Sequence, residues 1–301
     1  MKAVQLHGYG DVDQLRYEDV PTPKPRSGEV LVKVAVTSVN PIDWKIRRGD
    51  LKNVMPLQFP VILGRDVAGE VVETGANVSK WKPGQKVMGL VNRSYAEFLT
   101  ASAEALAPIP DGLDMEQAGV LPLVTTTGAQ LADHAQPKSG DTILITGALG
   151  SVGRTAVYEA KQKGARVIAG VRARQKRDAR ALRADQVVAI DSDEEIDGLP
   201  ELDAIADTVD HDVIDKLLRK LKRGGVLGSV LGKPKGAERK DIQVAAFMAQ
   251  SDAARLENLA EAVRTGALTI PIARKFKLSE AREAQKLSEQ GGIDGKIALV
   301  V

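Results

Sequence analysis

Residues 142–171, TILITGALGSVGRTAVYEAKQKGARVIAGV, decide the fold of this chain. An apolar run of strand length at 142–146 leads into a glycine-rich turn, and helical spacing then continues until Gly164 ends it. A second apolar strand follows at 166–171. A strand, a turn, a helix and a strand in this order predict one βαβ unit of a parallel sheet.

Further segments of the same kind follow along the chain. The strand candidates are QVVAI (186–190), DAIADTV (203–209) and GVLGSVL (225–231). An amphipathic helix precedes the last of them, and its apolar residues are Val213, Ile214, Leu217, Leu218 and Leu221. This repetition predicts an α/β fold with a doubly wound parallel sheet.

The glycines of the turn suggest a ligand. Gly147, Gly150 and Gly153 lie between a predicted strand and a predicted helix. Glycine at such positions permits a tight turn and lets the backbone approach a pyrophosphate, while the helix N-terminus supplies free N–H groups. Glycine turns between strands and helices are common, but in this βαβ context the pattern predicts a dinucleotide site.

The end of the next strand distinguishes between the two nicotinamide dinucleotides. An NAD site has an Asp or Glu about 20 residues beyond the first glycine, where it binds the ribose 2′-hydroxyl. Here the strand is followed by Arg172, Arg174 and Lys176, with no acid among them. Because guanidinium groups can bind a 2′-phosphate in bidentate fashion, NADPH is the predicted cofactor. The alternative is that these cations form a solvated basic start of a helix.

The first third of the chain is predicted to be β-rich. EVLVKVAV (29–36) alternates valine with other residues, and short strands with Gly- and Pro-marked turns follow it. Helix-like spacing begins near Met115. We expect one domain formed by residues 1–122 and 254–301, and a second, cofactor-binding domain formed by residues 123–253.

A family resemblance runs through most of the chain. It is carried by NPIDWKIRRG (40–49), GRDVAGEVVETGANV (64–78), KPGQKV (82–87), LPLVTTTGAQL (121–131), GGVLGSVLG (224–232), GKIALVV (295–301) and the glycine turn. These segments resemble the zinc-independent, zeta-crystallin-like quinone oxidoreductase branch of the medium-chain dehydrogenase/reductase superfamily. The early segments also resemble the plant-type enone and alkenal reductases of that branch.

The resemblance implies a GroES-like catalytic domain, a Rossmann domain and a set of site residues. Thr127 would contact the nicotinamide end, and Asn40, Asp43 and Lys45 would face the substrate. The positions implied for the rest of the cofactor are Gly147, Gly150, Val152 and Gly153 at the pyrophosphate, Lys176 supported by Arg172 at the 2′-phosphate, and Asp207, Val209, Leu231 and Gly232 along its inner side. For Asn40 and Asp43 a plain turn and helix cap is an equal alternative.

One position departs from the zinc alcohol dehydrogenases that LGRDVAGEVV (63–72) also resembles. Arg65 stands where those enzymes have a His, and a cation cannot ligate a metal cation. The chain has no cysteine, and His7, His134 and His211 are far apart in sequence. We therefore expect no metal, with Asn40, Asp43 and Arg65 serving a conjugated acceptor.

Three functions remain open from the sequence. The first is hydride transfer from NADPH to a quinone, and the second is reduction of the double bond of an enone or alkenal. The third is a non-catalytic NADPH-binding sensor or structural protein, because no side chain is an unmistakable proton donor.

Composition limits the partners. A net charge of +2 and 3% aromatic residues do not favour nucleic acid or anionic membrane, and no run of about 18 apolar residues occurs. A cytoplasmic enzyme is expected. DIQVAAFM (241–248) is an apolar strand that we expect to pair between copies in a homodimer.

Overall fold

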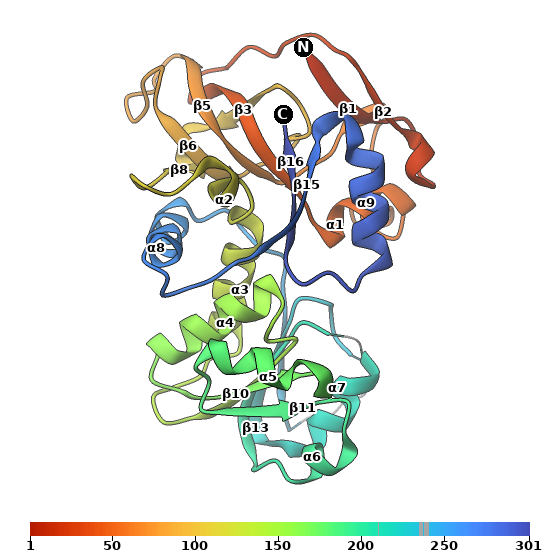
Figure 1. The fold of residues 1–301 in the computed structure, drawn as a ribbon, viewed down its shortest axis with the longest axis vertical. Helices are drawn as coiled ribbons and strands as arrows, with labels where there is room; N and C mark the ends of the chain where they lie inside the picture. The colour runs from red at the N-terminus through yellow and green to blue at the C-terminus, as the bar shows by residue number, and fades with distance from the viewer. Residues whose placement is uncertain (210, 235–236, 238–240) are drawn as a thin grey trace. The chain divides into compact units, whose positions relative to one another are not determined.

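The computed structural model describes residues 1–209, 211–234, 237 and 241–301. They form two compact units, which Figure 1 shows as a ribbon. The first unit comprises Met1–Leu123 and Ser251–Val301, and the second comprises Val124–Gln250. No helix in the described ranges is both long and apolar enough to cross a membrane.

The second unit is built on a six-stranded sheet in which all neighbouring strands are parallel. Its strand order is β11-β10-β9-β12-β13-β14. The strands are β9 (Thr142–Thr146), β10 (Arg166–Val171), β11 (Gln186–Ala189), β12 (Leu202–Asp207), β13 (Leu221–Ser229) and β14 (Gln243–Ala246). Counted along the chain this order is 3-2-1-4-5-6, so the strand order reverses between β9 and β12. The predicted doubly wound parallel sheet is confirmed.

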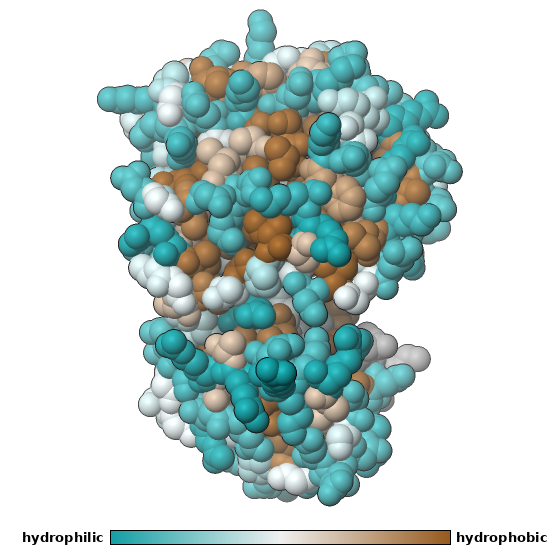
Figure 2. Space-filling view, viewed as in Figure 1, coloured by the Kyte–Doolittle hydropathy of each residue, from teal (hydrophilic) through white to brown (hydrophobic). Residues whose placement is uncertain are grey.

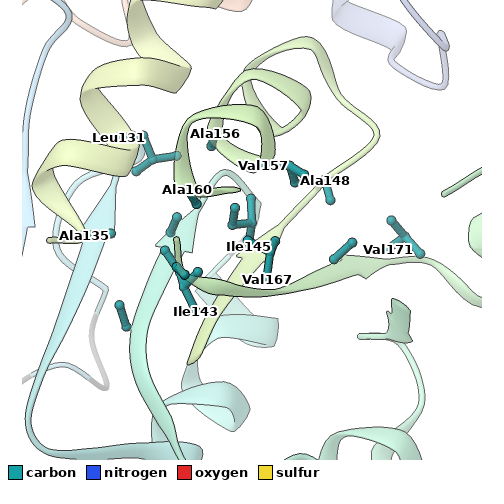
Figure 3. Packing of buried hydrophobic residues seen from close by; sticks show 14 of the residues in the cluster. Leu131, Ala135, Ile143, Ile145, Ala148, Ala156, Val157, Ala160, Val167 and Val171 are labelled. Atoms are coloured by element: carbon teal, nitrogen blue, oxygen red, sulfur yellow. The ribbon is translucent and has the colours of Figure 1, made fainter. Parts of the chain in front are cut away.

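Helices cover both faces of this sheet because successive strand residues point to opposite sides. Ile143 and Ile145 of β9 pack with residues of α3 and α4 (Figure 3), whereas Leu144 packs with Ile214 and Leu217 of α7. The helices are α3 (Pro122–His134), α4 (Ser151–Gln162), α5 (Lys176–Ala179), α6 (Asp193–Asp197) and α7 (His211–Leu217). Short 3₁₀ turns lie at Ala173–Gln175, Arg180–Leu182 and Leu218–Lys220.

The first unit is β-rich, as predicted. Its larger sheet has the order β15-β16-β3-β5-β6-β8, with β7 paired to β3, and a smaller sheet has the order β2-β1-β4. The strands are β1 (Lys2–Leu6), β2 (Leu15–Asp19), β3 (Glu29–Val39), β4 (Val61–Ile62), β5 (Asp66–Thr74), β6 (Lys86–Leu90), β7 (Phe98–Ser102), β8 (Leu106–Pro108), β15 (Ile272–Lys277) and β16 (Lys296–Val300). The last two come from the C-terminal segment, and β16 pairs antiparallel with β3.

The helices of the first unit are short. They are α1 (Pro41–Arg48), α2 (Met115–Gly119), α8 (Ala253–Arg264) and α9 (Ala281–Gln290), with 3₁₀ turns at Val12–Gln14, Ala103–Ala105 and Leu278–Glu280. Arg47, which is fully buried, joins α1 to α9 because its Nε donates to Gln285 Oε1 at 2.9 Å. Its Nη1 donates to the carbonyl of Gly10 at 2.8 Å. These two hydrogen bonds fix the position of α1 relative to α9 and to the loop at Gly10.

Candidate functional site

The glycine turn after β9 has the backbone geometry that the sequence pattern predicts. Gly147 has a φ of +57°, and a Cβ there would lie 2.4 Å from Thr208 Oγ1. A Cβ on Gly153 would lie 2.3 Å from the carbonyl oxygen of Gly147. Since both positions exclude any side chain, the turn and the first turn of α4 can pack directly together.

This turn presents the N-terminus of α4 at the carboxyl edge of the sheet. Gly150 is the N-cap residue, with φ −67° and ψ 157°, and the helix begins at Ser151. The first N–H groups of an α-helix have no acceptor within the helix, so they can bind an anionic oxygen. Val152 is partly buried and packs against the buried cluster below α4, and its place at the pyrophosphate remains a prediction.

Helix α3 lies close to the same turn. A Cβ on Gly128 would lie 2.4 Å from the carbonyl oxygen of Val152 and 2.6 Å from Thr155 Cβ, so α3 and α4 are in backbone contact there. Thr127 is the residue before this contact and is partly buried. The structure therefore brings the helix that carries Thr127 against the first turn of α4.

Asp207 is buried at the point where the strand order reverses. Its Oδ1 accepts from Thr146 Oγ1 at 2.9 Å, and its Oδ2 accepts from Ser229 Oγ at 3.1 Å. These contacts join the ends of β9, β12 and β13. The same carboxylate accepts from the N–H of Val209 at 3.2 Å, and Ser229 Oγ accepts from the N–H of Leu231 at 3.1 Å. Asp207 thus orients the two loops that follow β12 and β13.

Gly232 lies in the second of these loops. It has a φ of +94°, and an added Cβ would meet no atom within 4 Å. The residue is therefore required by backbone conformation and not by close packing.

The basic segment after β10 is not purely basic in three dimensions. Arg172 and Arg174 are exposed. Lys176, however, donates from Nζ to both carboxylate oxygens of Glu195, at 2.8 and 2.7 Å. Asp191 also lies here, since its Oδ1 accepts from the N–H of Ala173 at 2.8 Å. Neither acid could be placed here from the sequence, because both follow the next strand, β11, which pairs with β10.

The first unit contains a second polar group of residues, arranged around Asp66. The carboxylate is fully buried, and its Oδ2 accepts from Ser38 Oγ and, at 2.7 Å, from Asn40 Nδ2. Its Oδ1 accepts from the N–H of Leu123 at 2.6 Å. The ammonium of Lys296 lies 3.6 Å from Oδ2 and also donates to Asn40 Oδ1. The buried negative charge is therefore both hydrogen-bonded and paired with a cation.

Asn40 and Asp43 form the N-terminal cap of α1, the alternative that the sequence left open. The N–H of Asn40 donates to Asp43 Oδ2 at 2.9 Å, and the Tyr95 hydroxyl donates to the same oxygen at 2.9 Å. Both capping residues are 1% exposed. That either residue faces the substrate remains a prediction.

Burial controls the ionisation of this group. It raises the pKa of Asp43 to about 6, although the hydrogen bonds from Asn40 and Tyr95 act in the opposite direction. Burial also raises the pKa of the Tyr95 phenol well above its usual value, and the neighbouring Asp43 adds to this. Burial lowers the pKa of Lys296, against the attraction of Asp66 and Asp43. Ionisable groups with perturbed pKa values gather at functional sites more often than elsewhere.

Arg65 and Lys45 are close in sequence to this polar group, since Arg65 precedes Asp66 and Lys45 lies in α1, two residues after Asp43. Arg65 directly precedes β5 and is partly buried, and its Nε has no hydrogen-bond partner among the described residues. The ammonium of Lys45 lies 5.7 Å from the centre of the Trp44 ring, on which Arg48 also packs at 5.3 Å. Trp44 is partly buried. Within the described ranges, no group of three or more His, Cys, Asp or Glu residues could hold a metal ion.

Comparison with known proteins finds two family matches along the chain, of which the second extends from the second unit into the C-terminal segment of the first. Residues 26–111 match the family described as alcohol dehydrogenase GroES-like domain, and residues 182–299 match zinc-binding dehydrogenase. A chloroplast envelope quinone oxidoreductase homolog of Arabidopsis thaliana is 31% identical over 99% of this chain and 97% of its own length. The chain belongs to the quinone oxidoreductase branch of the medium-chain dehydrogenase/reductase superfamily.

Two further similar proteins indicate the type of reaction, since both are described as oxidoreductases. The structure of a quinone oxidoreductase from Coxiella burnetii has a TM-score of 0.90 and 34% identity, and the match covers 100% of this chain and 99% of that one. An Arabidopsis thaliana NADPH-dependent alkenal/one oxidoreductase is 32% identical over 77% of this chain and 63% of its own length. This medium-chain dehydrogenase/reductase is therefore an NAD(P)H-dependent oxidoreductase, with a GroES-like and a Rossmann-like domain, as predicted.

Several residues of this dehydrogenase's polar group were not predicted from the sequence. Ser38, Tyr95 and Lys296 were not singled out, although Lys296 falls in the GKIALVV segment that carried the resemblance. Asn40 and Lys296 are 256 residues apart in sequence, and Tyr95 and Asp43 are 52 apart. No local pattern signals pairings of that range.

Proposed function

We propose that this protein transfers hydride from NADPH to a quinone and needs no zinc for the reaction. The observation that carries the proposal is Arg65. It replaces the metal-ligating His of the zinc enzymes, and its buried Nε–H group has no partner among the described residues. A buried N–H donor without a partner can donate a hydrogen bond to an anionic oxygen that forms during reduction.

The residues of the second unit fit a dinucleotide. The N-terminus of α4 and the side-chain-free turn at Gly147, Gly150 and Gly153 would hold the pyrophosphate. Exposed Arg172 and Arg174 would hold the 2′-phosphate, and the loops oriented by Asp207 would line the inner side. A bound nicotinamide supplies the hydride. Thr127, on the helix packed against α4, is proposed to contact the nicotinamide end.

The donors near Asp66 do not fit zinc. Zinc takes thiolate, neutral imidazole or carboxylate ligands, and the chain has no cysteine. Both oxygens of Asp66 already accept hydrogen bonds, and the ammonium of Lys296 lies 3.6 Å away. A zinc ion there would be repelled by Lys296 and by the neighbouring Arg65. This charge arrangement supports a metal-free reaction, even though the family description that matches residues 182–299 names zinc.

The chemistry of the acceptor supports the same conclusion. Reduction of a simple carbonyl leaves an alkoxide, whose proton affinity is near that of hydroxide, and water has a pKa of about 15.7. Reduction of a quinone leaves a phenolate, and a phenol such as that of tyrosine has a pKa of about 10. The difference of roughly 6 units corresponds to about 8 kcal/mol of charge stabilisation that a metal no longer has to supply.

The residues of the first unit take different parts in this proposal. Arg65 would support the delocalised anion, and the final proton would come from solvent. Asn40 and Asp43 are buried, so they would act by fixing the start of α1 and, through Asn40 Nδ2, the position of Asp66. Removing the Asp43 carboxylate should then lower turnover without abolishing it.

Reduction of an enone or alkenal is the second candidate. The similarity to an NADPH-dependent alkenal/one oxidoreductase favours it, and the enolate formed is delocalised as a phenolate is. Arg65 would serve either anion.

The test is an acceptor panel. NADPH consumption is followed with a quinone, an α,β-unsaturated ketone, an alkenal and the matching saturated ketone. We expect the highest kcat/KM with the quinone and negligible turnover of the saturated ketone. A higher kcat/KM with the enone would select the second candidate. Tight NADPH binding with no turnover of any acceptor would instead indicate a non-catalytic binding protein.

A further inference from the structure

The basic segment after β10 is opposed by a carboxylate of α6. Glu195 Oε1 and Oε2 lie 2.8 and 2.7 Å from Lys176 Nζ. Glu195 Oε2 also accepts from the backbone N–H of Ala189, at 2.8 Å. One carboxylate thus binds both the ammonium of Lys176 and the end of strand β11, which fixes its position.

The order of the strands explains why Lys176 and Glu195 are in contact. Strands β10 and β11 are parallel neighbours, so the residues that follow them lie at the same edge of the sheet. Lys176 begins α5 after β10, and Glu195 lies in α6 after β11. In Figure 2 the surface over α5 and α6 is mainly hydrophilic. The Lys176 and Glu195 side chains are 41% and 33% exposed, so a phosphate could reach this pair from solvent.

The two arginines of the segment differ from Lys176 because they have no carboxylate partner among the described residues. Arg172 and Arg174 are exposed, and in the described part of the chain neither makes an ion pair. Of the three cations expected to bind the 2′-phosphate, Lys176 is the one whose charge is already compensated.

We propose that Glu195 sets cofactor selectivity, because it holds Lys176 in an ion pair and so weakens the contact between Lys176 and the 2′-phosphate of NADPH. The inference rests on the proposed function, in which Arg172 and Arg174 form the primary phosphate contact. Glu195 then acts on NADPH alone, since NADH has a neutral hydroxyl at that position. The preference for NADPH is moderate for this reason.

The physical basis is competition for one ammonium. A 2′-phosphate must share Lys176 with the carboxylate or displace it, and like charges close together oppose each other. Displacing the carboxylate costs little free energy, because exposed ion pairs are weak. The expected effect of removing its charge is therefore a few-fold change in affinity.

The decisive variant is Glu195→Gln, which keeps an oxygen that can accept from the Ala189 N–H. Dissociation constants of NADPH and NADH are measured by titration calorimetry, without any acceptor. We expect NADPH to bind about threefold to fivefold more tightly and NADH to bind as before. Asp193→Asn is the matched control, since Asp193 lies on the same helix and pairs with Lys216 at 2.6 Å. It should leave both constants unchanged.

A second comparison tests the role of Lys176 itself. Lys176→Met should weaken NADPH binding less in the native background than in the Glu195→Gln background, since only the latter frees the ammonium. The inference is overturned if Glu195→Gln leaves the ratio of the two constants unchanged, or if Asp193→Asn shifts it equally. Unchanged NADH affinity reports that the variants are folded. Failure of the native protein to bind either cofactor would overturn the proposed function as well.

Discussion

Asp43→Asn gives a pH-dependent change in stability that follows from the structure. The variant keeps the shape of the side chain and removes its charge. In the folded protein burial raises the pKa of Asp43 from 3.8 to about 6. Between these values the folded protein binds a proton that the unfolded chain does not, so the free energy of unfolding falls as pH rises. Below pH 3.8 the carboxyl is neutral in both the folded and the unfolded state, so it causes no further change of stability with pH.

The size of the effect follows from the shift. A difference of about 2 units at 1.36 kcal/mol each gives about 3 kcal/mol, of which about 2 kcal/mol is lost between pH 4.5 and pH 7. The asparagine variant lacks this loss. Its free energy of unfolding, relative to the native protein, should therefore rise by about 2 kcal/mol over that range.

Tryptophan fluorescence during urea unfolding reports on the correct unit. The chain has two tryptophans, Trp44 and Trp81, and both lie in the unit that contains Asp43. Asp13→Asn is the control, because Asp13 is exposed in the same unit. Its stability difference from the native protein should not vary with pH. A difference for Asp43→Asn that stays constant from pH 4.5 to pH 7, or that falls, would refute the reasoning.

Three further predictions concern other parts of the molecule. Lys296→Met leaves the buried Asp66 carboxylate without its cation, so we expect about 3–5 kcal/mol of destabilisation in the same urea assay; a loss below 1 kcal/mol would argue against the pairing. Gly153→Ala places a Cβ 2.3 Å from the Gly147 carbonyl oxygen and should weaken NADPH binding at least about tenfold, and unchanged calorimetric affinity would contradict this. Light scattering should show a dimer joined along β14, an edge strand of its sheet; a monomer at micromolar concentration would exclude it.

The parts of the fold that the sequence could predict are those encoded locally. The apolar strand at 142–146, the glycines at 147, 150 and 153 and the helix after them form one continuous segment. Alternation and helical spacing are short-range signals, so the parallel sheet followed from them directly. Arg172 and Arg174 directly follow a predicted strand, and their contact with the cofactor remains a prediction.

The parts that could not be predicted depend on pairing between distant residues. Glu195 contacts Lys176 because β11 lies beside β10, and the order of strands in a sheet cannot be predicted from local sequence patterns. Lys296 reaches Asn40 because β16 returns to pair with β3. For Asp43 the residue type indicated two possible roles, but its burial could not be predicted from the sequence. An Asp after Asn-Pro can cap a helix or face a ligand, and burial, which raises its pKa, appears only in the structure.

Substitution of Arg172 tests the proposed preference for NADPH directly. Losing a charge-assisted contact to the 2′-phosphate should cost about 1.5–3 kcal/mol of binding free energy, so Arg172→Ala should raise the Kd of NADPH without changing that of NADH. Equal affinities of the native protein for the two cofactors would contradict the assignment.

The most direct test of the account is quinone reduction by protein stripped of metal. The chain is dialysed against a strong chelator, its zinc content is confirmed by elemental analysis, and NADPH-dependent turnover of a quinone is compared before dialysis, after it and after zinc is restored. We predict the same kcat/KM in all three samples, because the ammonium of Lys296 already supplies the positive charge beside the buried Asp66 carboxylate. Loss of turnover on chelation with recovery on adding zinc would contradict it.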